Sequence, residues 1–215
     1  MRLCAETVSL RASAWRCRTV SGSVFAMARP PRIQAAGAAY HVFARATGEE
    51  LLHRDDEDRQ RFLSILAATV LRYRLEVHFA VVLGTHHHLL LTTSRRNIAA
   101  AMQYLGGVYC QSYNRRHGRR GHLVAGRYGA ELVASEGHAV WLVPYLALNP
   151  VRAGLVERPT QWPWSSYAAL VGVAPGWPFI QPGWVLEQFD ADRGRARVLL
   201  REYVERVAAQ DTIAA

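Results

Sequence analysis

The chain has 215 residues, of which half are hydrophobic and a fifth are charged, so it can bury a core and global disorder is excluded. Its uninterrupted apolar runs, such as 79–83, are too short to cross a bilayer, which excludes an integral membrane protein. Three cysteines without a CxxC pair make neither a disulfide framework nor a zinc motif, and they fit a cytoplasmic location.

Arginine carries all of the positive charge. The 26 basic residues are all Arg, against 17 acidic residues, for a net charge of +9. Guanidinium groups pair bidentately with phosphates and stack on bases, although a GC-rich genome would also explain the missing lysine. Residues 77–130 contain seven Arg and no acid, and such a stretch of one sign is typical of a surface that faces a polyanion.

The first part of the chain differs in composition from the rest. Residues 1–26 hold four Arg, four Ser and little periodicity, and a second Met follows at position 27. The pattern favours a disordered tail or a misannotated start, with a targeting segment of similar composition as the alternative.

From residue 39 onward the chain alternates between strand and helix patterns. Runs rich in β-branched and aromatic residues predict strands, and apolar side chains at helical spacing predict helices. The first half predicts a strand over 39–44, a helix whose N-terminus carries Asp55 and Asp56 and which runs to about Tyr73, and a hairpin of strands 75–83 and 86–92 that turns at Gly84-Thr85.

The second half of the pattern is more often interrupted. It predicts a helix over 97–116 that kinks at Gly106-Gly107, a strand over 123–133 interrupted at Gly126, a helix over 138–148 that Asn149-Pro150 stops, and a last amphipathic helix over 191–208. Strand, helix, hairpin, helix and strand make an α+β order, with helices packed on one face of an antiparallel sheet.

Three consecutive histidines open the second strand of the hairpin. Because residues i and i+2 of a strand point to the same face, His86 and His88 should project side by side, while His87 points the other way. Two adjacent imidazoles can present their nitrogens to one divalent ion. The alternative is a chance histidine run on an exposed turn.

A tyrosine near the end of the 97–116 helix is the candidate nucleophile. Tyr109 lies one turn before Tyr113, which shares its face and is the fallback. A tyrosine in such a helix is otherwise a core residue with its hydroxyl at the rim. Nearby arginines would hold a phosphate backbone within reach of the phenol, namely Arg115, Arg116, Arg119, Arg120 and Arg127.

Together these groups predict a phosphoryl-transfer site. The two histidines would fix a divalent ion that neutralises charge on a phosphodiester. A tyrosine phenolate would attack the phosphorus in line and displace the 3′-oxygen. The resulting 5′-phosphotyrosine keeps the bond energy, so a second strand can be joined by reversal.

A series of short motifs spans residues 27 to about 170. It comprises Met27–Ile33, Tyr40–Val42, His53–Asp56, His86–Leu90, Tyr109, Asn114–Gly118, Gly126–Tyr128, Leu148–Leu155 and Trp162–Tyr167. In this order the series resembles the single-tyrosine HUH transposases, especially the REP-associated tyrosine transposases. A lone HxH is a weak signal, but the ordered series is specific.

The resemblance implies a ferredoxin-like HUH domain over 27–170 and a C-terminal extension over 171–215 with an amphipathic helix. It implies an enzyme that cleaves and rejoins single-stranded or hairpin DNA, uses Mg²⁺ or Mn²⁺, and acts as a monomer or homodimer. Carried over residue by residue, His86 and His88 match the metal-ligating histidines, Tyr109 matches the nucleophile, and Asn114 matches a position near the metal.

The sequence departs from the family pattern around these groups. Gly84-Thr85 stands in place of the usual Pro-Asn, His87 in place of a hydrophobic residue or Tyr, Ala125 in place of Gln, and Gly129 in place of Lys. Two alternatives therefore stay open. One is a catalytically decayed, domesticated protein that binds hairpin DNA or RNA, and the other is a plain metal-binding protein with an incidental basic stretch.

Overall fold

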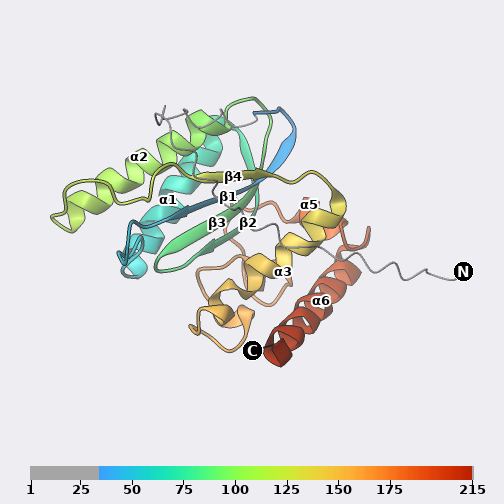
Figure 1. Cartoon of the computed structure of the whole chain (residues 1–215). Helices are drawn as coiled ribbons and strands as arrows, with labels where there is room; N and C mark the ends of the chain where they lie inside the picture. The colour runs from blue at the N-terminus through green and yellow to red at the C-terminus, as the bar shows by residue number, and fades with distance from the viewer. Residues whose placement is uncertain (1–33, 215) are drawn as a thin grey trace, which may run out of the picture. The chain divides into compact units, whose positions relative to one another are not determined.

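The computed structural model describes residues 34–214, which form a four-stranded sheet covered by helices (Figure 1). The expectation for residues 1–26 lies outside the described residues. In chain order the elements are β1 Ala38–Arg45, α1 Asp56–Tyr73, β2 Leu75–Val82, β3 His86–Thr93, α2 Ile98–Arg116, β4 Gly129–Leu132, α3 Glu136–Arg152, η1 Pro159–Gln161, α4 Tyr167–Leu170, α5 Gly183–Glu187 and α6 Arg193–Ala214.

The sheet has the strand order β2-β3-β1-β4, and each neighbouring pair is antiparallel. With α1 between β1 and β2 and α2 between β3 and β4, the connectivity is βαββαβ, that of the ferredoxin-like fold. The predicted α+β class with an antiparallel sheet is confirmed. Within residues 34–214, no helix combines the length and apolar character needed to cross a membrane.

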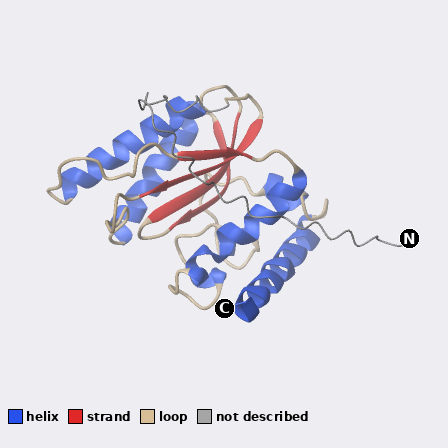
Figure 2. Cartoon of the chain, viewed as in Figure 1, coloured by secondary structure: helices blue, strands red, loops and turns tan. Residues whose placement is uncertain are grey.

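Helices cover both faces of the sheet (Figure 2), so the prediction that they pack on one face only is wrong. α1 and α2 pack on one face, over a core that includes Phe62 and Leu89. α3, α5 and α6 lie on the other side, where Leu146 and Leu200 share a second core cluster with Phe79 of β2. Because helices cover both faces, nearly all residues of β2 and β3 are buried, and burial does not alternate along these two strands.

Aspartates cap the start of α1, as the sequence predicts. The Asp55 side chain accepts a hydrogen bond from the backbone N–H of Asp58 at 2.9 Å, and the first turn carries negative charge that the helix dipole favours. The carboxylates of Asp55 and Asp58 also bind the Arg116 guanidinium at the end of α2, at 2.9 Å and 2.6 Å respectively. This cluster joins the N-terminus of α1 to the C-terminus of α2.

Two helices continue through residues where the sequence predicts an interruption. α2 continues unbroken through Gly106-Gly107, because burial of its apolar side chains on the sheet outweighs the low helix propensity of glycine. α3 continues through Asn149-Pro150 to Arg152, and burial of 146–148 accounts for its persistence. The predicted stop at Asn149-Pro150 is therefore wrong.

The last strand is shorter than predicted. Only Gly129–Leu132 pairs with β1, and Val124 forms an isolated bridge with Ala46. Gly126 has a φ of 75°, in the left-handed region that glycine tolerates, and it turns the chain between the bridge and β4.

A close approach between β1 and β4 requires glycine at position 129. Gly129 pairs with Phe43 in the ladder, and the Phe43 ring lies against its backbone. A Cβ placed on Gly129 would lie 2.2 Å from Cζ of Phe43, well inside the van der Waals separation. Phe43 in turn packs on His88, with ring centroids 6.0 Å apart.

We expect Gly129→Ala to lower the free energy of unfolding by about 1–3 kcal/mol, because the added methyl group overpacks the Phe43 ring. Gly107→Ala is the matched control. Gly107 is exposed within α2, and its added Cβ would meet nothing within 4 Å other than its chain neighbours and the backbone of its own helical turns, so the change should raise stability by about 0.5–1 kcal/mol. Urea denaturation followed by circular dichroism measures both. A Gly129→Ala protein as stable as its parent would contradict the contact.

Candidate active site

The pleat of β3 sends the three histidines to opposite faces of the sheet. The rings of His86 and His88 lie on the α3 side with centroids 5.0 Å apart, as expected from their i, i+2 spacing. His87 lies on the α1–α2 side, 4.2 Å from the ring of Phe62. The predicted pairing of His86 with His88 is confirmed, and their role as metal ligands stays a prediction.

A third imidazole from β1 joins the pair. His41 Nε2 lies 2.9 Å from His88 Nδ1, and Glu131 of β4 lies 3.7 Å from His41 Nδ1. The carboxylate favours the tautomer with the proton on His41 Nδ1, so His41 Nε2 accepts from His88 Nδ1–H. Thr85 Oγ1 lies 2.9 Å from His86 Nδ1. In histidines that coordinate a metal through one ring nitrogen, the other ring nitrogen typically makes a hydrogen bond, as both Nδ1 atoms do here.

Burial keeps these imidazoles neutral. It lowers the pKa of His88 to about 2, and neighbouring His41 adds to the shift. Burial also lowers the pKa of His86, against a side-chain hydrogen bond with Asn149 that raises it. The pKa of His41 falls for the same reason, although Glu131 opposes the shift. Neutral imidazole is the form that binds a metal ion.

The donor set fits a divalent cation with two protein ligands. Within residues 34–214, no group of three or more His, Cys, Asp or Glu side chains is arranged to hold a metal ion. His86 and His88 would hold such an ion. Its other positions would be left to water or substrate oxygens, as Mg²⁺ usually requires.

A tyrosine on α3 faces the histidines. The ring of Tyr145 lies 5.9 Å from that of His88 and 6.3 Å from that of His41, centroid to centroid. It lines a cavity of about 450 Å³ together with His86 and Arg45. One turn further along α3, Asn149 donates a hydrogen bond to the Tyr145 carbonyl at 2.9 Å. The cavity therefore brings a phenol, imidazoles and a guanidinium together.

The sequence pattern did not single out Tyr145 as a candidate site residue. The signal was present, because Trp141, Tyr145 and Asn149 recur at a spacing of four and share one face of the predicted 138–148 helix and its end. What the pattern did not show is that this face lies against the same side of the sheet as His86 and His88.

Tyr109 lies on the opposite side of the sheet from this cavity. It is 2% exposed, and its hydroxyl donates to the carbonyl of Leu52 and contacts His53 Nδ1, both at 2.7 Å. Burial, followed by the negative charge of Asp58, raises the pKa of its phenol and so opposes phenolate formation. The expectation that Tyr109 converges with His86 and His88 on one ion is therefore wrong.

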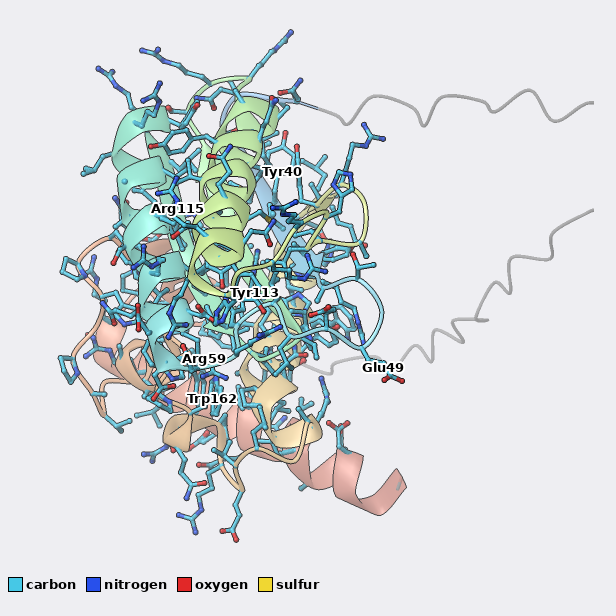
Figure 3. The ribbon with its side chains drawn as sticks, turned by 90° about the vertical axis from the view of Figure 1, so that its left-hand side faces the viewer. Tyr40, Glu49, Arg59, Tyr113, Arg115 and Trp162 are labelled. Carbon is cyan, nitrogen blue, oxygen red and sulfur yellow. The ribbon has the colours of Figure 1, made fainter. Side chains whose placement is uncertain are left out.

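The fallback tyrosine and the neighbouring amide are also far from the histidine pair. Tyr113 is buried in the same layer, and its hydroxyl donates to the carbonyl of Leu51 at 2.7 Å. Asn114 donates to the carbonyl of Gly121 at 3.0 Å and holds the loop that follows α2. Figure 3 shows Tyr113 and Arg115 on α2, in the layer that α2 forms with α1.

The predicted DNA-binding arginines fall into two groups. Arg116 is held by Asp55 and Asp58, and Arg119 lies 3.4 Å from Glu50. Their charge is used within the protein. The exposed members are Arg115, Arg120 and Arg127.

None of these three exposed arginines lines the histidine cavity. Arg115 borders a groove between α1 and α2, and Arg127 lines the cavity beneath α2. Arg45 of β1, which the sequence analysis did not single out, is exposed and lines the histidine cavity. A DNA contact by each of the predicted arginines stays a prediction of the sequence, and the position of Arg115 outside the histidine cavity argues against its contact with a strand bound there.

We expect Tyr109→Phe to lower the free energy of unfolding by about 1–3 kcal/mol, because it leaves the Leu52 carbonyl and His53 Nδ1 unpaired in the core. Tyr145→Phe is the matched control. Its side chain is half-buried at the cavity, and the change should stay within about 0.5 kcal/mol. Chemical denaturation compares the two, and equal stabilities would contradict a structural role for Tyr109.

Comparisons with known proteins bear on the fold. No protein-family model matches the chain, and no curated protein matches it significantly. The structure of the REP-associated tyrosine transposase bound to a REP hairpin is 17% identical with a TM-score of 0.59, and the match covers 70% of this chain and 91% of that one.

Two further structures are less alike. A candidate transposase from Deinococcus radiodurans R1 is 20% identical with a TM-score of 0.38, over 55% of this chain and 95% of that one. The tRNA(His) guanylyltransferase from Saccharomyces cerevisiae is 8% identical with a TM-score of 0.41, over 80% and 81%. From the first match, the chain has the fold of the REP-associated tyrosine transposase.

Proposed function

We propose that this protein is a transposase-like enzyme that cleaves and rejoins single-stranded or hairpin DNA through a covalent tyrosyl intermediate. The observation that carries the proposal is the convergence of His86, His88 and Tyr145 on one cavity. The fold shared with the REP-associated tyrosine transposase, which was solved with a REP hairpin, supports it. Tyr145 replaces Tyr109 as the proposed nucleophile.

The chain's own residues supply the geometry for this reaction. Tyr145 is half-exposed at the cavity, so its proton can leave to water as its oxygen attacks the phosphorus. The bond from phosphorus to the 3′-oxygen breaks, and that oxygen leaves with a proton from water. The new bond joins the 5′-phosphate to Tyr145.

The histidines support this attack from the sheet. His41 and Glu131 hold the His88 ring, and Thr85 contacts the His86 ring, so both imidazoles keep their direction. A bound Mg²⁺ or Mn²⁺ would neutralise charge on the phosphate oxygens. Arg45 at the cavity would pair with a neighbouring backbone phosphate.

The decisive experiment asks which tyrosine carries the DNA. A library of labelled hairpins with single-stranded flanks is incubated with Mn²⁺, and covalent protein–DNA adducts are resolved on denaturing gels. We expect an adduct with the parent protein and with folded Tyr109→Phe, and none with Tyr145→Phe or His86→Ala. Chelation should abolish the adduct and added Mn²⁺ should restore it.

Three results would argue against this mechanism. An adduct that persists in Tyr145→Phe, or that disappears in a folded Tyr109→Phe protein, would show that the nucleophile is misassigned. Tight hairpin binding with no adduct under any metal would favour the alternative of a non-catalytic hairpin-binding protein.

Arginine contacts are tested separately by salt dependence. Each phosphate contact by an arginine adds about 0.7 to the slope of log Kd against log salt for single-stranded DNA. We expect Arg45→Ala to lower that slope by about this amount and Arg115→Ala to leave it unchanged, because Arg115 borders the α1–α2 groove. The slopes are measured by fluorescence anisotropy titrations. If Arg115→Ala lowers the slope and Arg45→Ala does not, the strand lies along the groove between α1 and α2 instead.

A further inference from the structure

An exposed tryptophan stands beside the proposed nucleophile. Trp141 lies one turn before Tyr145 on α3 and is 59% exposed. It lines the same cavity as His86 and His88. The indole and the phenol rings are nearly parallel, at 8°, with centroids 5.8 Å apart. The two rings are therefore stacked on each other at the cavity, an arrangement called the aromatic shelf below.

Packing does not account for this side chain. The residues that follow it on α3, Leu142 and Val143, are 1% exposed and belong to the core between α3 and the sheet. Trp141 is left outside that cluster, so its burial contributes little to folding. Single exposed apolar residues are common, but this one also borders the cavity and aligns with Tyr145.

We propose that Trp141 is a stacking platform for one base that flanks the scissile linkage, an inference that rests on the proposed function above. A base lying on the indole would leave its own backbone phosphate directed toward Tyr145 and the histidine pair. Arg45, on the β1 side of the cavity, would contact the backbone beyond it. Every base has an aromatic face, so the platform would grip a single strand with little preference for sequence.

The shelf also suggests why the strand must be unpaired at the site. A base within a duplex is stacked on its neighbours and has no face open to an indole. A base in a single-stranded flank can leave its stack and lie on Trp141. The platform would therefore select unpaired nucleotides next to the cleavage position.

The test is a coupling measurement between Trp141 and a missing base. An abasic nucleotide is moved one position at a time along a hairpin with a single-stranded flank. Dissociation constants are measured by fluorescence anisotropy for Tyr145→Phe, which keeps the ring, and for the same variant with Trp141→Ala. We expect one abasic position to weaken binding about 5- to 100-fold when Trp141 is present and to have no further effect in Trp141→Ala.

Two controls accompany this scan. Trp141→Phe should keep part of the coupling, because a smaller ring still stacks. Leu71→Ala removes another exposed apolar side chain, 81% exposed on α1 in the opposite layer, and should leave every dissociation constant unchanged.

The outcomes separate the platform from the chemistry. If the parent protein forms the adduct and no abasic position couples to Trp141, the platform is wrong and the proposed function stands. If coupling appears and no adduct forms, the stacking site stands and the chemistry fails. If no variant binds the hairpins, both proposals are overturned.

Discussion

The register of β3 depends on hydrogen bonds between histidines on both faces of the sheet. Leu89, Leu90 and Leu91 suit either face, so a slip by one residue would still bury apolar side chains. A slip would, however, separate His88 from His41 and His87 from His53, and leave buried imidazoles without partners. The polar pairs, more than the leucines, therefore fix which histidines face α3. The position of the candidate site follows from that choice.

The opposite face uses the same residue types for structure. His87 Nδ1 lies 3.2 Å from His53 Nε2, and His53 Nδ1 lies 2.7 Å from the Tyr109 hydroxyl, which donates to Leu52. This buried chain links β3, the loop before α1, and α2. A tyrosine that contacts these histidines can thus be a structural residue or a candidate nucleophile, and the face of the sheet on which it lies distinguishes the two. Burial with every polar atom paired indicates a structural role for Tyr109.

Local patterns predicted most of the fold and half of the candidate site. Strand periodicity placed His86 and His88 together, and the acids before α1 proved to be caps, because both features depend on neighbours within a few residues. Tyr145 could not be placed in this way. Its meeting with His88 depends on which face of the sheet α3 covers, and helix propensity and spacing carry no information about that. The ion pairs of Arg116 and Arg119 were not predictable for a similar reason, since the acids that pair with them lie outside the acid-free stretch.

The C-terminal extension takes part in holding the candidate nucleophile. Asp211 of α6 accepts two hydrogen bonds from the Arg152 guanidinium, at 2.9 and 2.7 Å, and that guanidinium lies 5.5 Å from the centre of the Tyr145 ring. The ion pair is partly exposed and adds at most about 1 kcal/mol to stability. The ion pair instead orients the Tyr145 ring, because it holds the Arg152 guanidinium over a face of that ring while Trp141 stacks against the same ring. Tyr145 is thus oriented from the sheet, from its own helix and from α6, so the extension belongs to the architecture of the site.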